Sequence, residues 1–439
     1  MGIFRTPVNV AANSPSELLF FAAWIAGGLV ALCGALTYAE IGSRMPVTGG
    51  YYKIFSYAYH PSIAFAVNCI ILVSNAASLA GVALIGGEYI TGVFVPELNQ
   101  PGYMETAGNA SYIKTIQMTI AICAIVIFYG LNLLGLRMSS RTQNVLMLIK
   151  IVLVLLLISP LFFATDQTIP VSINNFSPTM NEYIKAFGIG LVAVSFTYGG
   201  YQQTINFGAE VEKPEKNIPR GIFLGILCII ILYMAINYAY VHVIGFEQLK
   251  TSKNIAAIMA SKVFGEHAER ILSVFLFLSV LAYVNVLLMS NPRVMYAMSK
   301  DGILPAGFQN RNRKGALVTS LSLFAGACVL VVFFAEEFDK ILSFSIFLDC
   351  FGMILSAATI FILRKRTSHL DGTGIFKMKL YPLLPVIFII SYVFVGISLF
   401  ISETKLSLIG LAVLTGFTLL YFLMNKKPPE DDESFLHNK

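Results

Sequence analysis

Ser195-Phe196-Thr197-Tyr198-Gly199-Gly200-Tyr201-Gln202-Gln203 interrupts an apolar segment that runs from about residue 183 to about residue 212. In hydrocarbon, backbone polar groups must be paired internally, so such an interruption is tolerated only where it is buried in protein or lines a cavity. A second glycine-containing segment, Met1-Gly2-Ile3-Phe4, precedes a helix of half the usual length. Two interpretations remain open for these residues. They form two broken helices around a solute site, or their glycines only allow close helix packing.

The composition around these segments is that of a membrane protein. The chain has 439 residues, of which 56% are hydrophobic and 12% are charged, whereas a soluble domain carries about 25% charged residues. About 20 helical residues cross a bilayer, so the length allows roughly a dozen spans. Continuous apolar runs such as residues 149–158 exclude the alternating pattern of a membrane β-barrel. We therefore predict an all-α membrane protein.

Apolar runs between charged and turn residues locate the spans. We expect a short helix at about 3–12, followed by spans at about 17–43, 58–95, 113–134, 142–163, 183–212, 219–245, 266–298, 316–335, 340–363, 380–401 and 405–424. Most of the 30 Lys and Arg residues fall in loops on one side of this arrangement. The positive-inside rule assigns that side, with the C-terminus, to the cytoplasm.

The formal charge of +6 follows from this asymmetry and from contact with anionic lipid, so we expect no nucleic acid partner. The six cysteines lie in apolar stretches, and the five histidines are scattered. These residues predict no metal site, no cofactor and no enzyme active site.

Lys150 lies in the middle of an apolar span, about ten residues from Arg141 and from Pro160. An ionisable residue at such a depth is by default a functional hypothesis. Its ammonium group could contact carbonyl groups of an unwound helix, or it could gain and lose a proton. A purely structural buried pair is the alternative.

Other charged residues lie at or within the ends of spans. Glu210 and Arg293 are on segments that both end on the inner side, so an ion pair that gates the site is one interpretation, with Glu40 as a further candidate. For Glu40 and Asp349 we expect an ordinary position at the membrane boundary, and for Glu88 a position facing an outer vestibule.

Four motifs occur in a fixed order along the chain. They are Gly2-Ile3-Phe4-Arg5-Thr6-Pro7; Tyr38-Ala39-Glu40 with Pro46-Val47-Thr48-Gly49-Gly50-Tyr51; Phe196 to Gly200 with Glu210, Pro214 and Pro219; and Ser290 and Arg293 with Asp301-Gly302-Ile303-Leu304-Pro305. In this order and spacing they resemble the amino acid, polyamine and organocation (APC) transporter superfamily. Within it, the chain is most similar to the L-type amino acid transporter group.

This resemblance implies a leucine-transporter-like fold of 5+5 inverted repeats, with 12 helices in the family and the first half of helix 1 absent here. We expect one transmembrane transport domain over residues 1–427. In it, helices 1b–5 would span about 3–163, helices 6–10 about 183–363 and helices 11–12 about 380–424. Residues 428–439 would form a disordered cytoplasmic tail.

The resemblance also implies roles for individual residues. Backbone N–H groups of Gly2 and Ile3 would bind a substrate carboxylate, and carbonyl groups near Phe196 would receive its amino group. Phe196 would also close the site as an outer gate. Thr197, Tyr198, Gly199 and Gln202 would complete the site, while Lys150 would replace a sodium ion and contact Asn285 or Ser290 on helix 8.

The function implied is sodium-independent transport of amino acids across the plasma membrane by alternating access. We expect neutral substrates, moved by exchange or with proton coupling, and a multi-pass protein in contact with lipid. The alternatives are a membrane amino acid sensor that does not transport, and a transporter of polyamines or other organic cations. The sequence assigns no oligomeric state.

Overall fold

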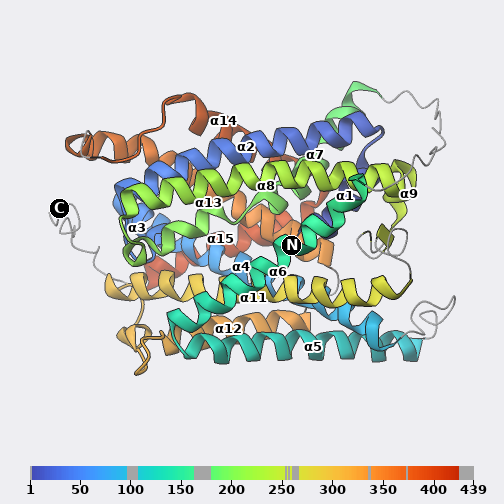
Figure 1. The fold of residues 1–439 in the computed structure, drawn as a ribbon. Coiled ribbons are helices and arrows are strands. Elements are labelled where there is room, and N and C mark those ends of the chain that lie inside the picture. Colours follow the sequence, from blue (N-terminus) through green and yellow to red (C-terminus); the bar gives the residue numbers. More distant parts are fainter. Residues whose placement is uncertain are drawn as a thin grey trace.

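The computed structural model describes residues 2–95, 107–162, 179–252, 255, 258–259, 266–334, 338–371 and 374–424. These residues form helices joined by short connections (Figure 1). Apart from two isolated bridges, they contain no β-structure. The predicted tail at 428–439 lies outside the described residues.

The first group of helices starts with a short pair and continues through four long helices. A Pro at the first turn of α1 and the Ser16 side chain, which accepts from the N–H of Leu19, define the starts of α1 and α2. The elements are η1 (Gly2–Phe4), α1 (Thr6–Asn13), α2 (Glu17–Arg44), α3 (Gly50–Ala58), α4 (Pro61–Phe94), α5 (Ala107–Leu133), α6 (Leu136–Ile158) and η4 (Ser159–Phe162).

The second group starts at α7, where Thr179 and Glu182 form a capping box. Two further helices, α14 and α15, follow it. The elements are α7 (Met180–Tyr198), η5 (Tyr201–Asn206), η6 (Gly208–Glu210), α8 (Pro214–Ile244), α9 (Phe246–Thr251), α11 (Glu266–Lys300), η7 (Ala306–Gln309), α12 (Val318–Phe334), α13 (Phe338–Arg366), η8 (Ser368–Leu370), α14 (Leu383–Ser402) and α15 (Thr404–Leu423).

Within the described residues, nine helices are long and apolar enough to cross a membrane. Nine of the eleven predicted spans correspond to these helices, with ends that differ by up to six residues, and the predicted span at 316–335 corresponds to the shorter α12 (Val318–Phe334). Two differences are larger. The predicted span at 183–212 is divided between α7, η5 and η6, and the predicted connection after residue 43 contains α3. Helix α3 was missed because it is short. It buries Tyr51, Tyr52, Ile54 and Phe55 on one side of the bundle.

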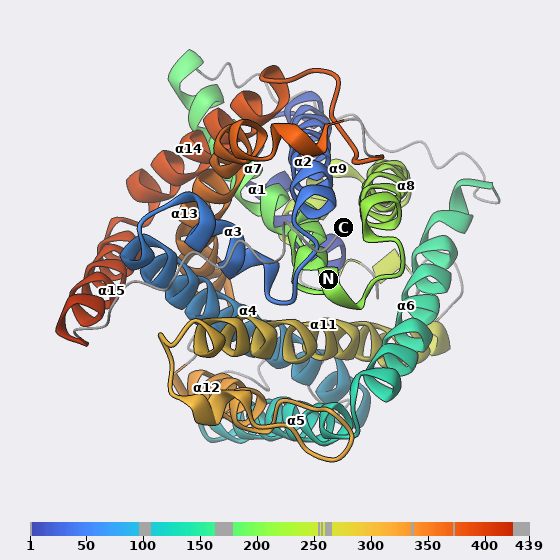
Figure 2. The ribbon, with the colours of Figure 1, turned by 90° about the vertical axis from the view of Figure 1, so that its left-hand side faces the viewer.

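The packing of the two groups follows one rule, which Figures 1 and 2 both show. Helix α1 packs against α7, α2 against α8, α4 against α11 and α5 against α12, so each of these helices of the first group contacts its counterpart in the second group. The cross pairs also correspond, because α4 contacts α13 while α11 contacts α6. This arrangement is that of the expected inverted repeat, and the all-α membrane class is confirmed. Helix α14 adds to α13, α2 and α7, and α15 to α4.

Small residues permit the close approach of α2 to its neighbours. A Cβ atom at Gly27 would overlap Val194 of α7, and one at Gly34 would overlap Tyr201 of η5. In a membrane, helices associate through such close contacts rather than through exclusion of water. These contacts fix α2 beside the end of α7.

Candidate functional site

The chain leaves helical geometry immediately after Tyr198. Gly200 has φ +115°, a conformation that glycine adopts far more readily than other residues. The Gln202 Oε1 atom accepts a hydrogen bond from the Gly200 N–H at 2.8 Å. The break is therefore stabilised by a side chain of the segment that follows it, and α7 ends without a regular continuation.

The opening segment of the chain lies against this break. A Cβ atom at Gly2 would overlap the Thr197 Oγ1 atom and would lie 2.9 Å from the Thr6 Oγ1 atom. The Thr197 hydroxyl group donates to the Ala193 carbonyl at 3.0 Å, which fixes its direction. Only glycine fits at position 2, so the two interrupted segments meet with their backbones in close contact.

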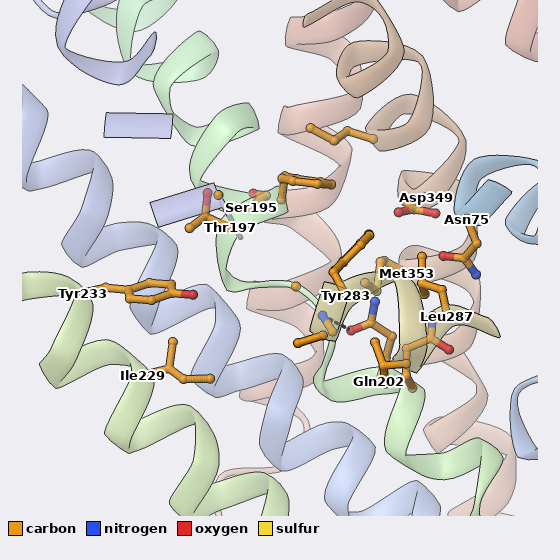
Figure 3. Close-up of a pocket in the computed structure, with 18 of the residues that line it drawn as sticks. Asn75, Ser195, Thr197, Gln202, Ile229, Tyr233, Tyr283, Leu287, Asp349 and Met353 are labelled. Atoms are coloured by element: carbon orange, nitrogen blue, oxygen red, sulfur yellow. Dashed lines mark hydrogen bonds between the residues drawn. The ribbon is translucent and has the colours of Figure 1, made fainter. Parts of the chain in front are cut away.

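A cavity of about 340 Å³ lies where these segments meet (Figure 3). Gly2 and residues of the break form part of its lining, and helices α4, α6, α8, α11, α13 and α14 supply the rest. In Figure 3, Asn75 and Asp349 lie on the opposite side of the cavity from Tyr233. The cavity is thus enclosed by both groups of helices.

Most of the residues predicted for a substrate site are together at this cavity. Gly2, Phe196, Thr197, Gly199 and Gln202 all line it. The Phe196 ring lies 6.5 Å from the ring of Tyr283 on α11, and the two rings form one wall. The Tyr283 hydroxyl group is held by Ser78 of α4 at 2.5 Å.

Two predicted residues lie outside the lining. Ile3 is fully buried in the packed core. The Tyr198 ring points into an aromatic cluster, with ring centroids 5.9 Å from Trp24 and 5.3 Å from Tyr233. The side chains of Ile3 and Tyr198 therefore support the site from behind, and only their backbone atoms belong to the interrupted segments.

Lys150 lines the same cavity from α6. The two residues proposed to contact it on α11 lie elsewhere. The Asn285 amide donates to the Ser139 carbonyl at 3.1 Å and to Gln143 at 2.8 Å, and accepts from Asn132 at 3.0 Å. The Ser290 hydroxyl group is buried and has no hydrogen-bond partner among the described residues.

Glu210 and Arg293 form the ion pair anticipated from the sequence. The Arg293 guanidinium contacts both Glu210 carboxylate oxygens, at 3.0 to 3.2 Å. It also lies over the Phe207 ring, 4.5 Å from its centroid. This pair borders a second cavity of about 220 Å³, which contains none of the break residues Phe196 to Gly200. It therefore joins η6 to α11 at one side of the central site.

Glu40 lies in a separate cluster and does not contact that pair. Its carboxylate accepts from the guanidinium groups of Arg44 and Arg364, at 2.7 to 2.8 Å, and from the Met378 N–H at 2.9 Å. Arg44 in turn contacts Asp371 at 2.8 Å. Glu40 therefore connects α2 to α13 and to the connection before α14.

On the other side of the central cavity, Arg5 and Glu88 form an ion pair at 2.6 Å. Arg5 precedes α1, and Glu88 lies near the end of α4, so this pair joins the first short helix to the long α4. The sequence predicted a vestibule position for Glu88 but no partner. Charged contacts thus lie on both sides of the central cavity.

Sequence reasoning missed several lining residues and misplaced one. Asn75, Gln143 and Tyr233 carry no local signal, since polar and aromatic residues are common in packed helices. Asp349 was expected at the membrane boundary, and this was wrong, because it lies in the middle of α13 and lines the cavity. The rule that a charge within a span is functional until shown otherwise would have identified it.

Comparisons with known proteins agree with this geometry. Residues 1–424 match the family described as amino acid permease. The serine/threonine exchanger SteT of Bacillus subtilis is 27% identical over 97% of this chain and 93% of its own length. The human cystine/glutamate transporter is 26% identical over 97% of this chain and 83% of its length. The large neutral amino acids transporter small subunit 2 of Rattus norvegicus is 25% identical over 96% of this chain and 77% of its own length.

These relatives are transporters and exchangers of the APC superfamily, and none is an enzyme. The match covers every described helix and both interrupted segments. The predicted resemblance is therefore confirmed, and the chain belongs to the amino acid permease family as a multi-pass membrane protein.

Proposed function

We propose that this chain carries amino acids across the plasma membrane by alternating access and without sodium. The observation that carries this proposal is the cavity where the two interrupted segments meet, which is lined by Gly2 from the first and by Phe196, Thr197, Gly199 and Gly200 from the second. Residues 1–427 would form one transport domain, and the C-terminal tail after it would lie in the cytoplasm. The printed functions of the relatives support the substrate class.

The interrupted helices suit a zwitterion. The start of a helix carries unpaired N–H groups and partial positive charge, and the end carries unpaired carbonyl groups and partial negative charge. Gly2 and Ile3 start η1, and α7 ends at Tyr198 beside them. We assign the substrate carboxylate to the N–H groups of Gly2 and Ile3, and its amino group to the carbonyl groups near Phe196.

Neutral side chains fit the rest of the cavity. Ile229, Val286, Leu287, Ile346 and Met353 contribute apolar surface. The Thr197 and Gln202 side chains add polar groups near the break, where they would contact a hydroxyl-bearing or uncharged substrate. Of the relatives, one exchanges serine and threonine and another carries large neutral amino acids. These observations favour neutral substrates moved by exchange.

Lys150 supports sodium independence. It lines the cavity together with Gly2, so its ammonium group lies where a cation could hold the first interrupted segment to α6. A fixed positive charge of this kind would make a bound sodium ion unnecessary. We keep Asn285 and Ser290 as candidates on α11, although the Asn285 amide has other partners in this conformation.

The two ion pairs would act as gates. Opening toward the cytoplasm would require Glu210 and Arg293 to separate, and opening toward the outside would require Arg5 and Glu88 to separate. Phe196 would move with the outer gate, because its ring covers the cavity beside Tyr283. Glu40 would act indirectly, by fixing α2 to α13.

The test is uptake of a panel of labelled amino acids and polyamines into proteoliposomes. We expect uptake of neutral amino acids that depends on substrate inside the vesicles and is unchanged when sodium is replaced by choline. Lys150→Ala should abolish exchange, whereas Glu17→Ala, at an exposed position on α2, should not. Strict sodium dependence, or full activity of Lys150→Ala, would refute the role given to Lys150. Uptake of polyamines alone would refute the substrate class.

A further inference from the structure

Asp349 places a carboxyl group in the wall of the central cavity. It lies eleven residues after the start of α13 and 17 before its end, so it is remote from both ends of the helix. The side chain is half-buried and lines the cavity opposite Tyr233 (Figure 3). A charged group at this depth in a membrane protein must be neutralised by a partner, a ligand or a proton.

Within the described residues, no lysine or arginine forms an ion pair with Asp349. Its carboxyl group accepts a hydrogen bond from the Ser74 Oγ atom on α4, at 2.7 Å. The polar and titratable groups around it are hydroxyls, a thiol, an amide and an amine. They are Tyr51 of α3, Asn75 of α4, Tyr283 of α11, Cys350 of α13, Tyr392 of α14 and, in the same cavity, Lys150 of α6.

The contact with Ser74 depends on the charge of the carboxyl group. The Ser74 Oγ atom lies 2.7 Å from Asp349 and 3.0 Å from the Ser345 carbonyl oxygen, but the hydroxyl group has one hydrogen to donate. If Asp349 is ionised, this hydrogen turns toward the carboxylate. If Asp349 is protonated, the acid donates to Ser74, and the Ser74 hydroxyl is free to donate to Ser345. Both contacts are satisfied at once only when Asp349 carries a proton.

The protonated arrangement also joins two helices. The Ser345 hydroxyl group donates to the Ser74 carbonyl at 3.3 Å, so with a protonated Asp349 the two serines bridge α4 and α13 in both directions. Deprotonation would release one of these bridges. A change in the charge of the carboxyl group would therefore change how α4 packs against α13. Both helices line the central cavity.

We propose that Asp349 is the proton-binding group of this carrier, and that it takes up and releases one proton during the transport cycle. This inference rests on the proposed function and adds the coupling ion to it. In the first step a proton from water forms an O–H bond with one carboxylate oxygen, and the site becomes neutral. In the return step that bond breaks and the proton passes to water on the other side, with no oxidation or reduction.

The experiment uses the full chain in proteoliposomes that contain a pH-sensitive dye. Adding a transported neutral amino acid to the wild type should move protons inward, and uptake should vary with external pH. A single titrating group changes its protonated fraction by up to about tenfold per pH unit. Asp349→Asn mimics the neutral acid. It should abolish the proton signal and flatten the pH profile of the amino acid exchange that remains. Glu17→Gln, which removes an exposed carboxylate, should behave as the wild type.

The outcomes separate this inference from the proposed function. If the wild type exchanges amino acids with no proton movement and no pH dependence, the inference is refuted and the proposed function stands. The same conclusion follows if Asp349→Asn keeps the proton signal, or if it loses only the uptake of amino acids with cationic side chains. If no amino acid is transported at all, the proposed function fails first. A poorly folded Asp349→Asn variant leaves the wild-type proton signal as the deciding result.

Discussion

Replacing Glu40 by alanine tests how strongly the cluster of Glu40, Arg44, Arg364 and Asp371 holds the bundle together. The Glu40 side chain is fully buried and accepts hydrogen bonds from Arg44, from two nitrogens of Arg364 and from the Met378 N–H. Removal of the carboxylate would leave two guanidinium groups without their shared partner. The Arg44 side chain is itself fully buried, so water cannot easily replace the lost contacts.

The loss of stability depends on the contacts that Arg44 and Arg364 retain after the Glu40 carboxylate is removed. Four hydrogen bonds to a charged group would total about 6–12 kcal/mol if they were independent. However, Arg44 retains Thr367 and Asp371, and Arg364 retains the Met378 carbonyl and the face of Tyr381, 3.8 Å away. The expected loss is therefore about 3–5 kcal/mol, the range for removal of one partner of a buried ion pair.

The assay is the apparent melting temperature of the purified protein in detergent, with Glu17→Ala as the control. Scaled to a chain of this length, the loss corresponds to a decrease of about 3–10 °C. Exchange per folded molecule should persist at low temperature, because the cluster joins α2 to α13 and is not a gate that opens during transport. A decrease no larger than that of Glu17→Ala would refute the calculation. Loss of exchange without loss of stability would identify Glu40 as a gate.

Three further predictions concern the ion pair, the break and the connection before α14. Glu210→Gln weakens the contact with Arg293 by about 1 kcal/mol, which should shift the population toward the cytoplasm-open state about fivefold and raise efflux relative to uptake. Gly200→Ala forces a side chain onto a residue with φ +115°, so substrate should no longer raise the melting temperature. Lys377 and Arg44 lower the pKa of the Asp371 carboxyl group. Asp371→Asn should therefore lower the melting temperature at neutral pH, and the difference from the wild type should vanish as the pH falls through that lowered pKa.

Matched controls make these predictions specific. For the Glu210–Arg293 ion pair, a double variant that exchanges the two charges should restore the wild-type ratio of efflux to uptake. If neither single variant changes this ratio, the ion pair is not a gate. For the break, Gly221→Ala in the exposed face of α8 should retain binding, because a Cβ atom there meets no other atom within 4 Å. For Asp371, stabilisation should be present above the unfolded pKa of about 3.9 and lost below the folded one. A difference in melting temperature between the wild type and Asp371→Asn that grows on acidification would contradict the lowered pKa of Asp371.

The parts of the structure that could be predicted from sequence depend on local chemistry. The spans follow from apolar length, and the break at Gly199-Gly200 follows from the effect of two glycines in a membrane helix. Lys150 was identified because a charge in hydrocarbon is costly. The same rule applied to Asp349, but its position relative to the helix ends was misjudged.

Other features depend on how distant segments meet. Whether the Tyr198 ring enters the cavity or packs on Trp24 depends on the rotation of α7 against α2. The partners of Asn285 depend on the crossing of α11 with α5 and α6, and those of Glu40 on the approach of Arg364 more than 300 residues later. Such contacts leave no periodic or local pattern in the sequence, so only the folded chain reveals them.

The pairing of helices in the first group with their counterparts in the second group also bears on how the protein is made. The main contacts of α1, α2 and α4 lie in the second group of helices, and those of α11 extend back to α4 and α6. The first helices to leave the ribosome therefore enter the bilayer before most of their packing surface has been synthesised. During this interval their glycine faces and charges must be shielded by lipid or by the insertion machinery. Completion of the bundle is consequently a late event, and a chain interrupted between residues 162 and 179 would yield halves that bury their helices only when they are produced together.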